Sequence, residues 1–239
     1  MACLLELKTP CGECVPLFSI HGHPLDSSKF IISGRDKFVR AHDVRKPAEP
    51  FATYCPSLFT DVPGLKLTKM YLTCAVYNYD GTEILGSYND DDVFLFDTKL
   101  DAYDSEISKL GYTHRYTGHR NCATFKGVAY FGPESQYVVS GSDCSYIFIW
   151  DKKTEAIVQW LRADIKGVVN CVVGHPKHPI LASSGLDSDV KIWYPNSESN
   201  PTFKGLESVL IRTNSLLFVS FILCLYHVLA LLFCKYNHL

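Results

Sequence analysis

A short pattern of turns and strands recurs four times along the chain. In each copy, a turn-bearing run of small residues is followed by a short strand of β-branched and aromatic residues, as expected for hairpins with buried faces. The residues that follow the aromatic position of each strand lie 54, 54 and 43 residues apart, and they are Asp43, Asp97, Asp151 and Tyr194. A repeat of about 40–50 residues is typical of a β-propeller blade. The pattern therefore predicts an all-β fold of about four blades, in which function lies on exposed loops.

The repeats divide the chain into a body and a tail. Residues 1–205 are predicted to form a partial propeller, and residues 206–239 share no repeat feature with it. Within the body, residues 46–69 carry several prolines and glycines and are expected to form a connector rather than strands. Strand and turn signals predict blades near residues 15–60, 68–115, 116–162 and 163–205.

The tail contains a hydrophobic segment, residues 215–234, which is predicted to be a helix. From Leu216 to Cys234 it has no charged residue, and 19 residues of helix span about 28 Å, nearly the thickness of the hydrocarbon core of a bilayer. One interpretation is a C-terminal membrane anchor with Arg212 and Lys235 at its two ends. The other is translated non-coding or alternative sequence in place of a final exon. We favour the second, because hydropathy shows only what a segment could do in lipid.

Composition narrows the class of function. The chain has 23 basic and 25 acidic residues, so no overall basic field favours nucleic acid as a direct partner. The ten cysteines are expected to be reduced thiols. Cys11 and Cys14 are followed by His21 and His23, but this spacing fits a zinc finger poorly, so we predict no metal site. Since no nucleophile and base, phosphate-binding glycine loop or strong metal set stands out, the chain is predicted to have no cofactor and not to be an enzyme.

Polar residues at fixed places in the repeats are expected to stabilise the blades. Six positions before the aromatic position, an acidic residue can bind the backbone amides of the tight turn. Cys144 takes this place in the third repeat, and Asp143 beside it could serve instead. A buried hydrogen-bond chain in that repeat would rigidify the sheet. Its members are His119, Ser140, Asp143 and Trp150, which we interpret as structural rather than catalytic. The same structural role is predicted for Asp36, Asp90, Asp187 and Trp193.

The third and fourth repeats carry the motifs of a known family. The stretch from Gly118 reads Gly-His-Arg-Asn-Cys-Ala-Thr, and the stretch from Val138 reads Val-Val-Ser-Gly-Ser-Asp-Cys. The fourth repeat reads Leu-Ala-Ser-Ser-Gly-Leu-Asp and ends on Val-Lys-Ile-Trp at Trp193. With these motifs the chain resembles WD-repeat proteins of the cullin-four-associated factor family, from about Phe18 to about Thr213.

The resemblance implies a substrate receptor of a cullin-RING ubiquitin ligase. Its partners would be the ligase adaptor, which is the large subunit of the damage-specific DNA-binding protein, through it cullin-four, and an unidentified protein substrate. Such propellers have about seven blades, so four repeats imply a partial propeller that corresponds to the C-terminal half. Localisation in the nucleus and cytoplasm is implied as well. The alternative is a tail-anchored, membrane-associated WD-repeat scaffold without a ligase role, held by residues 215–234.

The docking motif of that family is a strand that ends in an aromatic residue, followed by Asp-x-Arg. Only the first repeat supplies it, at Asp43 and Arg45, and His42 stands where tryptophan or tyrosine is usual. Lys99 and Lys153 occupy the place of the arginine in the next two repeats and cannot reproduce the paired hydrogen bonds of a guanidinium. The resemblance implies that Asp43 and Arg45 dock the adaptor. The alternative is a solvated rim charge that contributes under about 1 kcal/mol.

Overall fold

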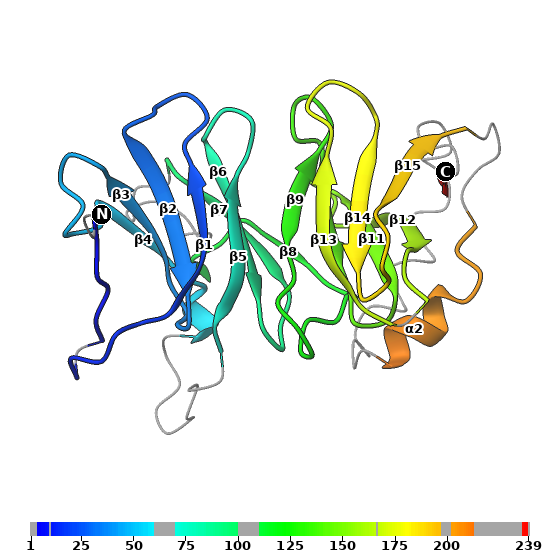
Figure 1. The fold of residues 1–239 in the computed structure, drawn as a ribbon, viewed down its shortest axis with the longest axis horizontal. Helices are drawn as coiled ribbons and strands as arrows, with labels where there is room; N and C mark the ends of the chain where they lie inside the picture. Colours follow the sequence, from blue (N-terminus) through cyan, green and yellow to red (C-terminus); the bar gives the residue numbers. More distant parts are fainter. Residues whose placement is uncertain are drawn as a thin grey trace. The chain divides into compact units, whose positions relative to one another are not determined.

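Four antiparallel sheets of four strands each make up the structure (Figure 1). It is a computed structural model that describes residues 4–9, 11–59, 70–99, 110–165, 167–196, 202–212 and 236–238. In each sheet, strands that follow one another in sequence are also neighbours in space. This is the arrangement of a β-propeller blade, so the prediction of an all-β fold with four blades is confirmed.

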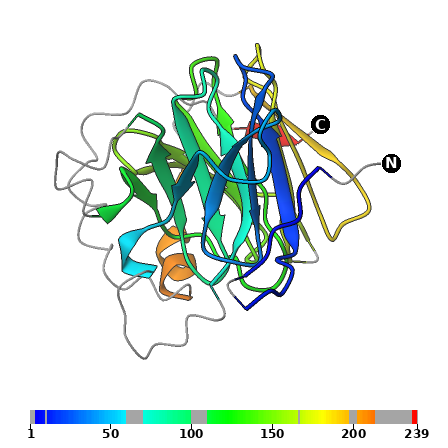
Figure 2. The ribbon, with the colours of Figure 1, turned by 90° about the vertical axis from the view of Figure 1, so that its left-hand side faces the viewer.

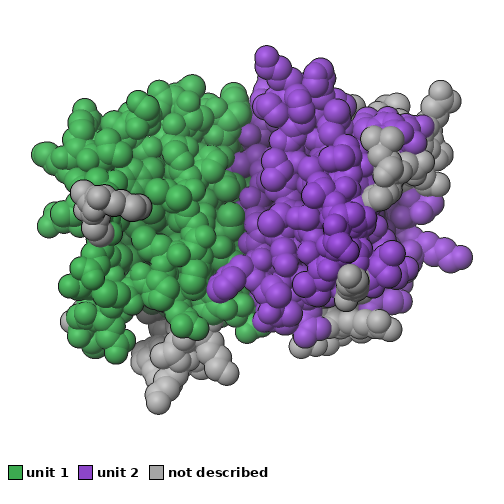
Figure 3. Space-filling view, in the orientation of Figure 1, with its two compact units in different colours: residues 1–115 green, residues 116–239 purple. Residues whose placement is uncertain are grey.

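The chain divides into two compact units, residues 1–115 and residues 116–239 (Figure 3). The first unit holds two sheets, and the first of them faces the viewer in Figure 2. That sheet consists of β1 (Leu17–Gly22), β2 (Lys29–Gly34), β3 (Val39–Asp43) and β4 (Ala52–Tyr54). The second sheet consists of β5 (Leu72–Tyr77), β6 (Glu83–Tyr88), β7 (Val93–Asp97) and β8 (His114–Tyr116), whose last residue opens the second unit.

One part of the first sheet differs from the prediction for residues 46–69. Within the expected connector, β4 pairs with β3, so that Val39 lies opposite Tyr54 and Ala41 opposite Ala52. The 3₁₀ helix η1 (Ser57–Phe59) follows and buries Phe59. This segment is ordered by backbone hydrogen bonds to β3 and by the burial of one aromatic ring. Its proline and glycine content reveals neither of these interactions.

The second unit also holds two sheets. The third sheet consists of β9 (Val128–Phe131), β10 (Tyr137–Gly141), β11 (Tyr146–Asp151) and β12 (Ile157–Arg162). The fourth consists of β13 (Val169–Gly174), β14 (Leu181–Gly185), β15 (Lys191–Pro195) and β16 (Tyr236–His238).

One short helix, α2 (Leu206–Arg212), also belongs to the second unit. It buries Leu206 and Leu210, which lie on one helix face because they are four residues apart. The predicted hydrophobic segment 215–234 lies outside the described residues. Within the part of the chain that the structure describes, no helix combines the length and the apolar character needed to span a bilayer.

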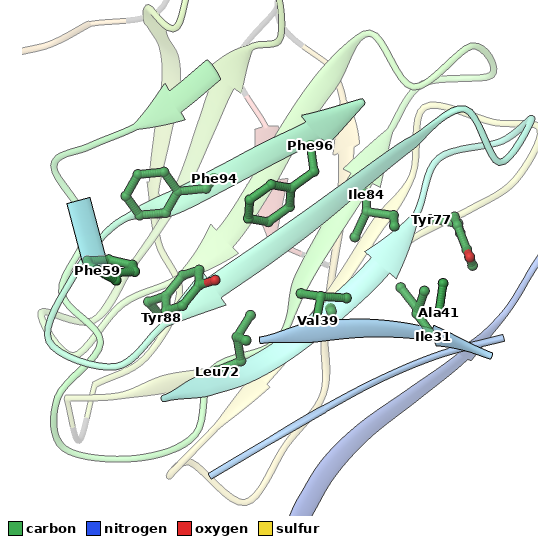
Figure 4. Close-up of a cluster of buried hydrophobic side chains, with 11 residues drawn as sticks. Ile31, Val39, Ala41, Phe59, Leu72, Tyr77, Ile84, Tyr88, Phe94 and Phe96 are labelled. Atoms are coloured by element: carbon green, nitrogen blue, oxygen red, sulfur yellow. The ribbon is translucent and has the colours of Figure 1, made fainter. Parts of the chain in front are cut away.

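Side chains from both sheets share the core of the first unit (Figure 4). Its members alternate along the strands, as Val39 and Ala41 do on β3, because successive side chains point to opposite faces. The buried Tyr88 ring lies 4.9 Å from that of Phe59, and its hydroxyl donates to the carbonyl of Lys37 at 2.9 Å. That bond ties the second sheet to the turn between β2 and β3. The side chains that alternate along the strands thus pack between the two sheets and join these neighbouring blades.

The core of the second unit is built in the same way from the third and fourth sheets. Many of its members come from β10, β11, β13, β14 and β15. They include Val139, Ile147, Ile149, Val169, Val172, Leu181 and Trp193.

The glycines in the repeated turns are required because a larger side chain has no space there. An added methyl group at Gly34 would overlap the carbonyl oxygen of Pro16, and one at Gly185 would overlap that of Val168. At Gly141 it would overlap the carbonyl of Val169, the first residue of the neighbouring β13. Each glycine lies at the end of a second strand, where an entering chain crosses it closely. Because the clash is with backbone, it cannot be relieved by a rotamer change.

Replacing Gly185 with alanine is therefore expected to lower the free energy of unfolding by about 1–3 kcal/mol. Urea unfolding at neutral pH would measure the change. Gly127→Ala is the matched control, since the nearest atom to an added methyl group there is the Asn170 carbonyl oxygen at 3.5 Å, an ordinary contact. Equal stability of the two variants would contradict the close approach at Gly185.

Candidate protein-docking site

The predicted docking residues lie where β3 ends. Asp43 is the last residue of the strand, and its Oδ1 accepts the backbone N–H of Arg45 at 2.8 Å. The same carboxylate accepts the guanidinium, with Nε 2.9 Å from Oδ1 and Nη2 2.5 Å from Oδ2. This side-chain hydrogen bond is the main reason that the pKa of Asp43 falls to about 2. Asp43 therefore stays ionised and fixes the orientation of the guanidinium.

The Arg45 side chain remains exposed to solvent although its guanidinium is bonded to Asp43. Its side chain is 72% exposed, against 20% for that of Asp43. Apart from Asp43, no described residue bonds to the guanidinium, so its Nη1 amino group can still donate. A planar group with fixed orientation and free donors is suited to paired hydrogen bonds with a carboxylate or carbonyls.

The turn around Asp43 is shared by three blades, but the arginine is not. Asp97 accepts the backbone N–H of Lys99 at 2.8 Å, and Asp151 accepts that of Lys153 at 3.2 Å. The aspartate thus shapes the same turn in each blade. Only Arg45 adds a guanidinium to it, so a docking role would belong to the arginine, with Asp43 as its positioning residue.

His42 takes the aromatic position of the first repeat, and its ring is buried in the blade. Its Nδ1 lies 2.9 Å from the carbonyl of Pro47, and its ring stacks on Phe30 with centroids 5.6 Å apart. Burial is the main cause of its lowered pKa, so the ring is neutral at pH 7. His42 therefore anchors the turn that carries Arg45, as an aromatic residue would.

The predicted hydrogen-bond chain in the third sheet is arranged differently from the expectation. The indole N–H of Trp150 donates to the carbonyl of Thr117 at 2.9 Å, and not to Ser140. The Ser140 hydroxyl donates to the backbone carbonyl of Gly141 at 3.1 Å. His119 meets the indole edge-on, with centroids 5.6 Å apart. Because the loop that leads to His119 brings a carbonyl to the indole, Ser140 is not needed as its acceptor.

The fourth sheet contains the tryptophan–serine hydrogen bond that the third sheet lacks. The Trp193 indole donates to the hydroxyl of Ser183 at 2.8 Å, and both side chains are buried. Ser183 was not singled out by the sequence, although its place two residues beyond the partner of the tryptophan matches that of Ser140.

Two of the predicted turn carboxylates tie loops together. Asp143 accepts the backbone N–H groups of Cys122 at 2.7 Å and Ala123 at 2.9 Å, and it pairs with the ammonium of Lys126. Asp187 accepts the N–H of Ile165 at 3.0 Å and the ammonium of Lys191 at 2.9 Å. Asp143 thus occupies the role that the pattern placed at position 144.

The other two carboxylates stay within their own hairpins. Asp36 accepts the N–H of Phe38 at 3.1 Å and forms a two-pronged ion pair with Arg40. Asp90 has a φ of 58° and bonds to the side chain of Asn89 at 3.2 Å. Aspartate tolerates this left-handed conformation better than most residues do, which explains its place in the turn.

Buried lysines were missed by the sequence. The side chain of Lys126 is fully buried beside Asp143, and that of Lys191 is almost buried beside Asp187. Lys191 opens β15 and follows Asp187 by four residues, and this short spacing was the available signal. Lys126 lies two residues before β9 and 17 residues before Asp143, so only the fold brings that pair together.

The potential zinc ligands are not gathered. Cys14 lies in a short hairpin, where its thiol donates to Glu6 at 3.1 Å, and Cys11 is exposed. In the described ranges, no group of three or more histidine, cysteine or acidic side chains could hold a metal ion.

Comparison with known proteins connects these blades to a family. The family model "WD domain, G-beta repeat" matches residues 111–151 and 159–194. DDB1- and CUL4-associated factor 6 of Homo sapiens is 47% identical over 103 residues, which are 43% of this chain and 12% of that protein. The human WD and tetratricopeptide repeats protein 1 is 45% identical over 89 residues, which are 37% of this chain and 13% of that protein.

A fungal relative agrees with these two. WD repeat protein iqw1 of Schizosaccharomyces pombe is 39% identical over 103 residues, which are 43% of this chain and 12% of that protein. The chain thus spans about an eighth of the length of the relatives it matches. The sequence motifs of residues 116–193 predict a resemblance to factor eight of the cullin-four-associated factor family, and the relatives found include factor 6. Residues 111–151 and 159–194 thus match the WD-repeat family model, and the chain is similar over 43% of its length to DDB1- and CUL4-associated factor 6.

Proposed function

We propose that this chain is a substrate receptor of a cullin-four RING ubiquitin ligase and acts without catalysing a reaction itself. The observation that carries the proposal is its 47% identity to a protein whose name states association with DDB1 and CUL4. In this role the blades bind the adaptor DDB1, which is the large subunit of the damage-specific DNA-binding protein, and present a protein substrate for ubiquitination. The protein would then act in the nucleus and cytoplasm.

Asp43 and Arg45 are the proposed adaptor contact. Their support is geometric, because an ionised Asp43 holds an exposed guanidinium that still has free donors. These two residues lie outside the segments that the family model matches, so the contact is a separate part of the proposal. The blade residues His119, Ser140, Asp143, Trp150, Asp36, Asp90, Asp187 and Trp193 are proposed to shape the blades.

Co-purification of the full chain with DDB1 and CUL4 from cells tests the receptor role. Recovery of both proteins with the tagged chain is expected, and absence of both would overturn the proposal.

Replacing Arg45 with alanine is expected to reduce DDB1 binding by at least about 10-fold, as loss of a central arginine contact does at other interfaces. Arg45→Lys should restore little, because an ammonium cannot make paired hydrogen bonds. Affinity for purified DDB1 would be measured. Lys153→Ala is the matched control, since it removes an exposed cation from the corresponding turn of the third sheet. Unchanged affinity of Arg45→Ala would remove this contact from the proposal.

A further inference from the structure

The fourth sheet exposes a face that is buried in the first and third sheets. One cross-strand pair has the same place beside the aromatic position of each of these sheets, and the three pairs are Ile31–Ala41, Val139–Ile149 and Ala182–Ile192. The first two pairs are fully buried in the cores of the two units, whereas the third is partly exposed. Val190, two residues before Ile192, is 66% exposed. The residues at its place, Val39 and Ile147, are fully buried.

Strand β13 continues this exposed face. Val173 lies opposite Ala182 and is 64% exposed. The residue at its place in the first sheet is His21, which lies opposite Ile31 and whose Nδ1 accepts the backbone N–H of Tyr77 at 3.3 Å. The exposed face of the fourth sheet therefore consists of the positions with which the first sheet packs against the second.

The first sheet exposes the other kind of face, which the second and fourth sheets bury. Leu72 opens β5 and Val169 opens β13, and both are buried in the core between two sheets. Leu17 has their place at the start of β1, with the same register shift after it, and is 43% exposed. Three positions further on, the residues of β5 and β13 are at most 4% exposed, whereas Ile20 of β1 is 70% exposed.

The two exposed faces are matched to each other. Faces of these two kinds pack together between the first and second sheets, and again between the third and fourth. A repeat buries its apolar face against a neighbour, and an outer face that meets only solvent normally carries polar side chains. Leu17, Ile20, Val173 and Val190 are apolar instead. The cover that fits the fourth sheet is thus the exposed face of a first sheet, which a second copy of the chain supplies.

We propose that the exposed face of the fourth sheet binds the exposed face of the first sheet in a second copy of this chain. In this head-to-tail contact, Val173 and Val190 of one copy pack against Leu17 and Ile20 of the other. The contact is heterologous, because two different surfaces meet. It involves neither Arg45 nor the adaptor, and it goes beyond the proposed receptor role.

Sedimentation velocity of the full chain over a range of concentrations tests this contact. The unmodified chain is expected to sediment above the mass of one chain. Val190→Glu and Ile20→Glu should each weaken the association by at least about 10-fold, because each buries an unpaired charge in an apolar contact. Leu25→Glu is the matched control and should associate like the unmodified chain, since Leu25 is 75% exposed but lies in the turn between β1 and β2.

A mixture of the two variants distinguishes a head-to-tail contact from other kinds of association. Val190→Glu keeps an unmodified first sheet, and Ile20→Glu keeps an unmodified fourth sheet. Their equimolar mixture should therefore form dimers that neither variant forms alone, which would also show that both variants are folded. A single-chain mass for the unmodified chain at every concentration would overturn the proposal. Association that neither variant weakens, or that the mixture does not recover, would overturn it as well.

Discussion

Replacing Lys126 with methionine is expected to lower the free energy of unfolding by about 3–5 kcal/mol. The lysine side chain is fully buried, and its ammonium donates to the hydroxyl of Thr124 at 2.6 Å and pairs with Asp143. Methionine keeps most of the apolar stem but removes the charge. The Asp143 carboxylate would then remain buried with two backbone N–H donors and without a counter-ion. Equilibrium urea unfolding at pH 7 would measure the loss.

A second substitution separates the charge effect from packing. The double variant Lys126→Met/Asp143→Asn should recover most of the lost stability, because asparagine can accept from the two N–H groups without a charge. Lys153→Met, at an exposed lysine, should change stability by no more than about 0.5 kcal/mol. Equal stability of the single and double variants would show that the ion pair is not the source of the effect.

Acidification is expected to weaken the protein through His119. Burial is the main cause that lowers its pKa to about 4, and the Lys126 ammonium adds to this effect while Asp143 opposes it. In the unfolded chain the imidazole has a pKa near 6.5. Between pH 6.5 and 4 the unfolded state therefore binds a proton that the folded state excludes. Linkage then predicts that His119 costs roughly 3 kcal/mol of stability at pH 4 and almost nothing above pH 7.

The measurement compares the pH dependence of unfolding in two proteins. The unmodified chain should lose more stability between pH 7 and pH 4 than His119→Phe, which keeps an aromatic ring against Trp150 and cannot titrate. Burial raises the pKa of Asp143, but the hydrogen bonds from Lys126, Cys122 and Ala123 outweigh it, so the pKa is lowered. The stability that this carboxylate contributes is therefore also lost in acid. That loss occurs in both proteins and does not affect their difference. If the free energy of unfolding fell in parallel with pH in the two proteins, that result would contradict a buried neutral His119.

The blades were predictable from the sequence because their signals are local. Alternating apolar residues mark the inner strands, and the glycines at 34, 141 and 185 mark close backbone crossings. The outer strand β4 was not predictable, since it has three residues and owes its order to pairing with β3. Short edge strands carry little pattern of their own.

The candidate site was predictable only in part. The Asp-x-Arg motif located Asp43 and Arg45 because their contact spans two residues. The acceptor of the Trp150 indole was missed, because a backbone carbonyl at Thr117 leaves no trace in residue type.

Hydrogen exchange of the full chain with and without purified DDB1 tests the central claim most directly, because it locates the contact without any substitution. We expect DDB1 to slow exchange in residues 43–51, the connection that holds Arg45. Slower exchange confined to other segments, or no change at saturating DDB1, would contradict docking through Arg45.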